Sequence, residues 1–94
     1  MDERMVMVTT EKRGVFAGRL LTESEDGSVV ELADAQMCVY WSPAVRGVIG
    51  LAATGPDAQS RITQLTPRAK LFGVTAICDL TAEAAAAWRA CPWG

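Results

Sequence analysis

Apolar residues in the first third of the chain occur in short runs separated by polar and glycine-containing segments. The runs at residues 5–10 and 15–22 are rich in Val, Leu, Phe and Thr, as is typical of β-strands. A third run at residues 29–32 follows Asp26-Gly27, a pair that is a common signature of a tight hairpin turn. This pattern predicts consecutive antiparallel strands, with Gly18 as a bulge or bend inside the second one.

Residues 36–43 form the most distinctive stretch of the chain, because sulfur-containing and aromatic side chains are concentrated there. The β-pattern is interrupted at residues 33–35, which predicts a bulge or a tight corner, and the strand is expected to end at Ser42-Pro43 because proline cannot donate to a sheet. Alternation along an unbroken strand would place three side chains on one face and two on the other: Met37, Val39 and Trp41 against Cys38 and Tyr40.

The second half of the chain contains a glycine-rich stretch and predicts one exposed loop, one strand and one helix. Residues 45–54 are rich in glycine and low in charge, and residues 58–67 are polar enough to form an exposed loop. Apolar residues alternate over residues 72–80, which predicts one strand whose stronger apolar face holds the even positions. Thr81 can cap a helix over residues 82–90, which consist largely of good helix formers.

These elements predict a mainly β (α+β) fold in a single domain over residues 1–94. The sheet is expected to be small, antiparallel and curled, or a partly open barrel, with about five strands and one C-terminal helix. Trp88 stands out from the alanines of that helix, and Trp93 follows it closely. The two rings predict a helix that docks on the sheet or across an oligomer interface.

Composition excludes several functional classes. A net charge of -2, from nine Lys and Arg against eleven Asp and Glu, disfavours generic coating of DNA or RNA, although a local basic site remains open. No apolar run approaches the roughly 18 residues needed to span a bilayer. The chain has no His, and its three Cys form no Cys-x-x-Cys pair. We therefore expect no metal and no cofactor, and reduced thiols in the cytoplasm.

The inventory of catalytic residues is equally short. Without His, a Ser or Cys nucleophile lacks its usual base, and no nucleophile or phosphate-loop motif is present. Cys38 in an apolar strand is interpreted as a small buried hydrophobic residue, with a reactive thiol as the alternative. We therefore predict no catalytic residues and a protein that is not an enzyme.

A ligand-binding protein is the expected alternative. Tyr40 and Trp41 are adjacent in a strand, so at least one of them is expected to stack on a ligand or a partner subunit, unless both pack in the core. Arg46 and Lys70 are candidate phosphate contacts, and Thr54 is a candidate hydrogen-bond donor. A solvated loop arginine is the alternative for Arg46. The 50% hydrophobic content is high for so short a chain, which favours a homo-oligomer.

Three segments resemble a family of small uncharacterised proteins encoded by tailed bacteriophages: residues 13–18, 33–42 and 46–52. The likeness covers nearly the whole chain and implies a phage origin and expression in the cytoplasm of a bacterial host. A weaker resemblance, over residues 15–34, is to Sm-like small β-barrels.

Three functional expectations follow from this resemblance and the candidate site. The first is a counter-defence protein that sequesters a small nucleotide-type signal or blocks a host immune protein. The second is a structural or assembly protein of the virion. The third is an Sm-like ring that binds RNA. The ligand, the number of subunits and presence in the virion are left open by the sequence.

Overall fold

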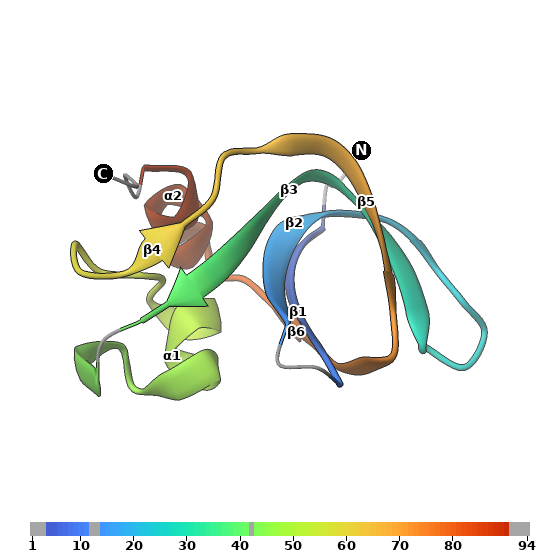
Figure 1. Cartoon of the computed structure of the whole chain (residues 1–94), viewed down its shortest axis with the longest axis horizontal. Coiled ribbons are helices and arrows are strands. Elements are labelled where there is room, and N and C mark those ends of the chain that lie inside the picture. Colours follow the sequence, from blue (N-terminus) through green and yellow to red (C-terminus); the bar gives the residue numbers. More distant parts are fainter. Residues whose placement is uncertain (1–3, 12–13, 42, 91–94) are drawn as a thin grey trace.

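The computed structural model describes residues 4–11, 14–41 and 43–90 (Figure 1). Strands make up most of the chain, and the helices lie in its second half. The elements in order are β1 (Met5–Thr10), β2 (Val15–Glu23), β3 (Val29–Tyr40), the 3-10 helix η1 (Pro43–Val45), α1 (Gly47–Ala53), β4 (Arg61–Ile62), β5 (Thr66–Phe72), β6 (Val74–Asp79) and α2 (Ala82–Ala90).

The strands form one antiparallel sheet in the order β4-β3-β2-β1-β6, and β5 also pairs with β3. β3 is the central strand, because its first part pairs with β5 and its end pairs with β4, both on the side away from β2. The predicted mainly β fold, with antiparallel strands and a C-terminal helix, is confirmed. The described residues form six strands rather than about five. The sheet is open rather than curled into a barrel, since β5 and β6 form no ladder with each other among the described residues.

The predicted hairpin turn at Asp26-Gly27 is present between β2 and β3. Gly27 has a φ of 79°, which favours glycine. The Asp26 carboxylate accepts hydrogen bonds from the Ser28 amide (3.0 Å) and from the hydroxyls of Ser28 (2.8 Å) and Ser24 (2.9 Å). The turn is therefore held by local side-chain contacts that a short sequence motif can specify.

Both irregularities predicted in the first half of the sheet are found. The β2–β3 register shifts between Ala17 and Arg19, and a Cβ atom at Gly18 would lie 2.8 Å from the Ala33 carbonyl oxygen. Asp34 has a φ of 51°, yet β3 continues through it. The interruption at residues 33–35 is thus a bulge inside one long strand.

The second half differs from the predictions in three places. The strand predicted at residues 72–80 is found as β6 (Val74–Asp79), but Phe72 is not part of it, because Gly73, with a φ of 66°, turns the chain from β5 into β6. The glycine-rich residues 45–54 contain α1. Residues 58–67 are not simply an exposed loop, because β4 lies within them and buries Ile62.

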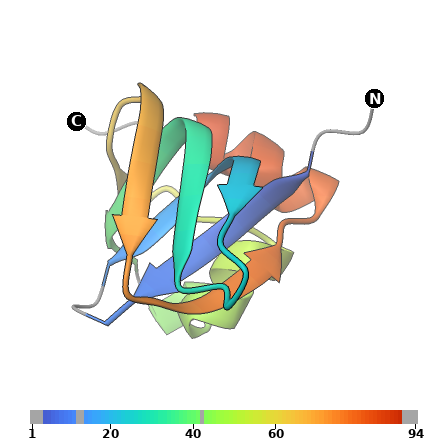
Figure 2. The ribbon, with the colours of Figure 1, turned by 90° about the vertical axis from the view of Figure 1, so that its right-hand side faces the viewer.

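Two apolar clusters pack against the sheet. In Figure 2, β5 and β3 run side by side at the front and both helices lie behind the sheet. The cluster on the helical side contains Trp88, Leu51 and Met7, and the second cluster contains Val6, Leu32 and Leu71. The Thr81 hydroxyl accepts a hydrogen bond from the Ala84 amide (3.0 Å), so the predicted cap of α2 is confirmed.

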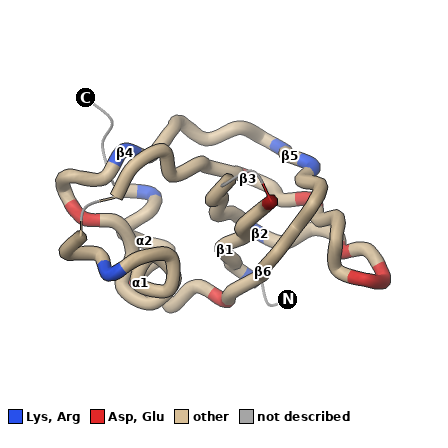
Figure 3. Tube along the Cα trace, turned by 60° about the horizontal axis from the view of Figure 1, so that its bottom comes forward, with Lys and Arg blue, Asp and Glu red and all other residues tan. Residues whose placement is uncertain are grey.

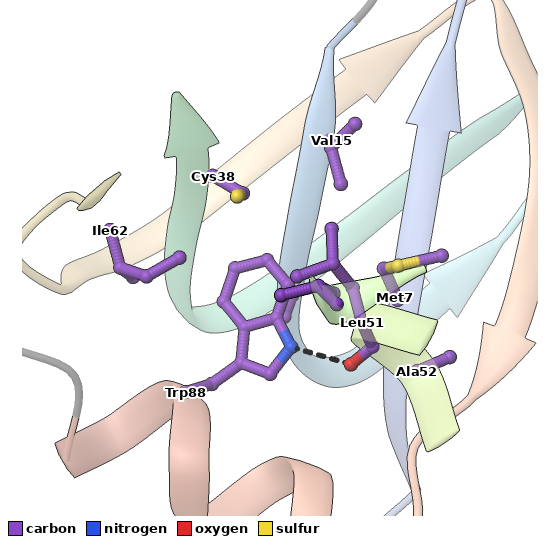
Figure 4. Packing of buried hydrophobic residues seen from close by; sticks show 9 residues of the cluster. Met7, Val15, Cys38, Leu51, Ala52, Ile62 and Trp88 are labelled. Carbon is purple, nitrogen blue, oxygen red and sulfur yellow. Dashed lines mark hydrogen bonds between the residues drawn. The ribbon is translucent and has the colours of Figure 1, made fainter. Parts of the chain in front are cut away.

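Trp88 belongs to the core of the domain. Its side chain is 1% exposed and points from α2 toward α1 and the sheet (Figure 4). The prediction that this helix docks on the sheet is therefore confirmed for Trp88. Trp93 lies outside the described residues.

The prediction that side chains alternate strictly at the end of β3 is wrong. Cys38 is buried in the helical-side cluster and Trp41 packs against the same cluster, although alternation puts them on opposite faces. The β3–β4 register shifts between Cys38 and Tyr40, and a bulge of this kind changes the face to which the following side chains point. Cys38 is buried as predicted, and its thiol donates to the Tyr40 carbonyl oxygen at 3.4 Å.

Candidate functional site

The five predicted site residues lie on three separate parts of the structure. Tyr40 ends β3 and Trp41 follows it, Arg46 and Thr54 flank α1 at its two ends, and Lys70 lies on β5. The structure does not assemble them into one site. Arg46 and Thr54 line one hollow and Lys70 lines another, with no residue in common.

The first hollow, called the α1 hollow below, has a volume of about 410 Å³. Arg46 has a left-handed backbone conformation (φ 69°) at the start of α1, and its side chain is exposed. The Thr54 hydroxyl already donates to the Gly50 carbonyl oxygen at 3.1 Å. The remaining lining side chains are small or aliphatic, including Ile49 with 65% exposure. The lining residues are Ala44, Val45, Arg46, Ile49, Gly50, Ala53 and Thr54.

The predicted stacking rings line neither of these hollows. Trp41 is half-buried against the helical-side cluster, which is the core-packing alternative. Tyr40 is 48% exposed beside Arg61, its partner across β3 and β4. Among the residues that the structure describes, the α1 hollow therefore offers one guanidinium and an apolar floor, and no aromatic ring.

The second hollow, called the β5 hollow below, has a volume of about 430 Å³. It lies where the turn between β1 and β2 meets the corner between β5 and β6. The Glu11 amide joins these two segments by donating to the Gly73 carbonyl oxygen at 2.9 Å. The lining residues are Thr10, Glu11, Phe16, Lys70, Leu71, Phe72 and Gly73.

An exposed aromatic ring is the main feature of the β5 hollow. Phe72 is 64% exposed, and the Lys70 ammonium lies 5.6 Å from the centroid of its ring, within the range of a cation–π contact. Phe16 is half-buried in the same hollow. The hollow thus combines an exposed ring with a cation over it, and the carboxylate and hydroxyl groups of Glu11 and Thr10.

Sequence reasoning missed Phe72 and Phe16 as site residues. Alternation placed Phe72 on the apolar face of a strand that was assumed to continue to residue 80. The corner at Gly73 ends β5 at Phe72 instead. The glycine immediately after the aromatic residue was the available signal, because an isolated glycine in a strand pattern also marks bends.

The outer face of β5 carries the positive charge next to this hollow. Arg68 and Lys70 are both exposed, and Figure 3 shows their positions on β5 and the negative positions on the hairpin between β2 and β3. Arg68 forms an ion pair with Glu31 of β3. The hydrogen bonds from Arg68 and from Thr22 lower the pKa of Glu31 below its usual value, so this carboxylate stays ionised.

Metal sites and membrane-spanning helices are two further classes to consider for residues 4–11, 14–41 and 43–90. Within these ranges, no group of three or more His, Cys, Asp and Glu residues is arranged to hold a metal ion. Neither α1 nor α2 has the length and apolar character required to cross a bilayer.

Comparison with known proteins identifies the family and no function. Residues 3–88 match the model of a domain of unknown function (DUF6948). Searches of the curated proteins and of the solved structures found no match that met the significance threshold. A functional conclusion must therefore come from the geometry of the molecule.

Proposed function

Since the chain belongs to the DUF6948 family, which carries no functional description, we propose from its geometry that it is a non-catalytic binding protein for a nucleotide-type ligand. The ligand lies in the β5 hollow. The observation that carries this proposal is the exposed ring of Phe72 with the Lys70 ammonium 5.6 Å from its centroid. A stacking surface and a cation side by side suit a base and a phosphate.

The exposure of Phe72 supports a ligand in this hollow. Most of its ring is in contact with water, which is unfavourable for a large apolar side chain. A base stacked on the ring would remove that surface from water, and base–aromatic stacking contributes about 1–3 kcal/mol per base. The Lys70 ammonium lies over the ring at 5.6 Å from its centroid, so a base would stack on the opposite face while Lys70 donates to a phosphate. Glu11 can accept hydrogen bonds from an amino or hydroxyl group of the ligand.

This proposal keeps Lys70 from the predicted set and replaces Tyr40 and Trp41 by Phe72. Arg46 and Thr54 line the α1 hollow, which has no aromatic residue, so they serve as controls. Tyr40 remains half-exposed at the end of β3, which suits a subunit contact better than a stacked base in either hollow.

The biological setting of the proposal rests on the sequence resemblance to phage proteins. In the cytoplasm of an infected bacterium, a protein that binds a nucleotide without consuming it acts by sequestration. This activity fits counter-defence against a nucleotide signal. Blocking of a host immune protein, a structural role in the virion and an Sm-like ring on RNA are the competing functions.

The first experiment measures nucleotide binding by the whole chain. In a thermal-shift screen confirmed by calorimetry, we expect a nucleoside monophosphate to raise the melting temperature by mass action. Phe72→Ala and Lys70→Ala should each weaken binding about tenfold or more. Ile49→Ala, which truncates an equally exposed residue of the α1 hollow (65% against 64%), and Arg46→Ala should leave the affinity unchanged.

Two results decide between the proposal and its competitors. No binding of any nucleotide, together with stoichiometric presence of the protein in purified virions, would establish the structural role instead. We also propose, from the high hydrophobic content of so short a chain, that the protein is a homo-oligomer, and light scattering tests this. We expect a species larger than one chain at tens of micromolar, and a monomer at that concentration would refute it.

A further inference from the structure

The outer face of β5 extends the β5 hollow in one direction. Arg68, Lys70 and Phe72 are alternate residues of the strand and all three are exposed, whereas Leu71 between them is buried in the second cluster. Alternate side chains of a strand point to the same face and are spaced by roughly 6.6–6.8 Å. The face therefore presents a ring, an ammonium and a guanidinium in a row.

We propose that the ligand is a dinucleotide, with one base on Phe72 and two phosphates held in series by Lys70 and Arg68. The inference rests on the proposed function and specifies its ligand class. A row of cations beside a stacking ring follows a sugar-phosphate chain. A single phosphate would engage Lys70 alone and leave Arg68 unused.

The ion pair with Glu31 prepares Arg68 for this role. Nε and Nη2 of Arg68 both approach Oε1 of Glu31, and Glu31 is held in turn by the Thr22 hydroxyl, which donates at 3.1 Å. The Glu31 side chain is 19% exposed and that of Arg68 is 63% exposed. Because a guanidinium has five N–H donors in a fixed fork, contact with one carboxylate oxygen leaves donors directed to solvent. These donors can bind a phosphate in bidentate fashion.

The charges at the two ends of this row limit the ligand to about two phosphates. β5 passes into the corner at Gly73, and the Val74 amide donates to the Ser28 carbonyl oxygen at 3.0 Å, so the acidic hairpin lies beside the Phe72 end of the row. The Asp26 carboxylate on that hairpin has a lowered pKa of about 2 and repels a further phosphate. At the other end of the described strand, Thr66 and Pro67 supply no charge. Affinity should therefore stop rising after the second phosphate.

Fluorescence or calorimetric titration of the whole chain tests the ligand class. The probes are adenosine monophosphate, the 5′-phosphorylated adenine dinucleotide, a cyclic adenine dinucleotide and a single-stranded decamer. We expect either dinucleotide to bind about tenfold more tightly than the monophosphate, since a charge-assisted contact is added. The decamer, compared per binding site, should bind no more tightly than the dinucleotides. The linear and cyclic arms distinguish a segment of a nucleic acid from a closed signalling molecule.

Variants of the Arg68–Glu31 pair separate phosphate binding from a structural role. Arg68→Ala should remove the tenfold gain and leave the monophosphate affinity unchanged, whereas Arg68→Lys should retain most of the gain. Glu31→Gln should tighten dinucleotide binding several-fold, because the carboxylate competes with the phosphate for Arg68. Arg61→Ala, which removes an exposed arginine of β4, is the matched control and should have no effect.

The salt dependence gives an independent readout. The logarithm of the dinucleotide affinity should fall against the logarithm of salt concentration with a steeper slope in the wild type than in Arg68→Ala, because salt screens two charge contacts rather than one. Equal affinities for the monophosphate and the dinucleotides would refute the dinucleotide as the ligand, and so would an unchanged salt slope in Arg68→Ala. Neither result would refute the proposed nucleotide site. Absence of binding by every probe would refute the proposed function itself. An affinity that keeps rising with strand length would show that the ligand is a nucleic acid and not a dinucleotide.

Discussion

The indole Nε1 of Trp88 donates a hydrogen bond to the carbonyl oxygen of Leu51 at 3.1 Å (Figure 4). Both side chains are almost completely buried, Trp88 at 1% and Leu51 at 0% exposure. This contact joins α2 to α1 across 37 positions of the sequence. Thr81 adds two further bonds between the helices, to the carbonyl oxygens of Ala52 and Ala53. The two helices thus act as one layer against the sheet, and Trp88 is its buried link.

Substitution of Trp88 should destabilise the whole domain. Trp88→Phe keeps an aromatic ring but removes the donor to Leu51, at an expected cost of about 1–3 kcal/mol in the free energy of unfolding. Trp88→Ala also creates a cavity and should cost about 3–5 kcal/mol. Urea denaturation measures both values. Arg89→Ala, at the exposed neighbouring position, is the control, and its free energy of unfolding should lie within about 0.5 kcal/mol of the wild-type value. Wild-type stability in Trp88→Ala would show that α2 is not part of the core.

The elements that the sequence predicted are those specified by local chemistry. The hairpin at Asp26 depends on hydrogen bonds to residues two positions away, and the cap of α2 depends on Thr81 and Ala84. Such contacts are specified by neighbouring residues, so a short motif predicts them. Gly18 was also recognisable, because a glycine inside a strand pattern indicates a bend.

The elements that the sequence did not predict depend on distant contacts. α1 contains two glycines in its seven residues, and its propensity to form a helix is therefore low. It is stabilised by Leu51 and Ala52 in the core. The site was missed for a related reason. Period-two alternation continues across Gly73 in the sequence and outweighs the bend that this glycine also signals, whereas the tertiary structure shows that the chain turns there and leaves Phe72 exposed.

Gly50→Ala should destabilise the protein, although alanine is the better helix former. A Cβ atom at Gly50 would clash with the Val45 carbonyl oxygen, which is a backbone atom that cannot move aside alone. Overpacking of this kind costs about 1–3 kcal/mol or more, whereas helix propensity alone would give a gain of about 1 kcal/mol.

Gly47→Ala is the matched comparison for Gly50. A Cβ atom at Gly47 meets nothing within 4 Å, and its φ is 79°, so the substitution costs only the backbone strain of about 1–2 kcal/mol. Thermal unfolding of the two variants should therefore rank Gly50→Ala below Gly47→Ala. A Gly50→Ala variant more stable than the wild type would contradict the close packing of η1 against α1.

Protonation of Asp26 should weaken the hairpin in acid. The hydrogen bond from the Ser28 amide and those from the hydroxyls of Ser28 and Ser24 lower its pKa from 3.8 to about 2. Because the pKa of Asp26 is lower in the folded state, its carboxylate stabilises the hairpin fully above pH 3.8, and this stabilisation is lost as the pH falls toward 2. Amide exchange at Ser28 and Val29 measures the effect. In Asp26→Asn this dependence should be absent, and a dependence of equal size in the variant would exclude Asp26 as its source.

Gln36→Glu should produce a destabilisation that depends on pH. The Gln36 side chain is 6% exposed, and its Nε2 donates to the carbonyl oxygens of Thr63 and Trp88, both at 3.2 Å. A glutamate here would direct a buried carboxylate at two oxygen atoms, so we expect a loss of roughly 3 kcal/mol or more at neutral pH. Desolvation and these oxygens raise the pKa of the introduced carboxyl group above its unfolded value of about 4.3.

The direction of the pH effect separates charge from simple loss of hydrogen bonds. The folded state of the Gln36→Glu variant binds its proton more tightly than the unfolded state, so the penalty is largest above the folded pKa and shrinks as the pH falls toward about 4.3. Gln36→Met has a similar length and no charge, and its loss should be independent of pH. Urea denaturation of both variants at several pH values measures the difference. Parallel pH profiles would show that residue 36 is hydrated, and the link between β3 and α2 would then be weaker than its burial implies.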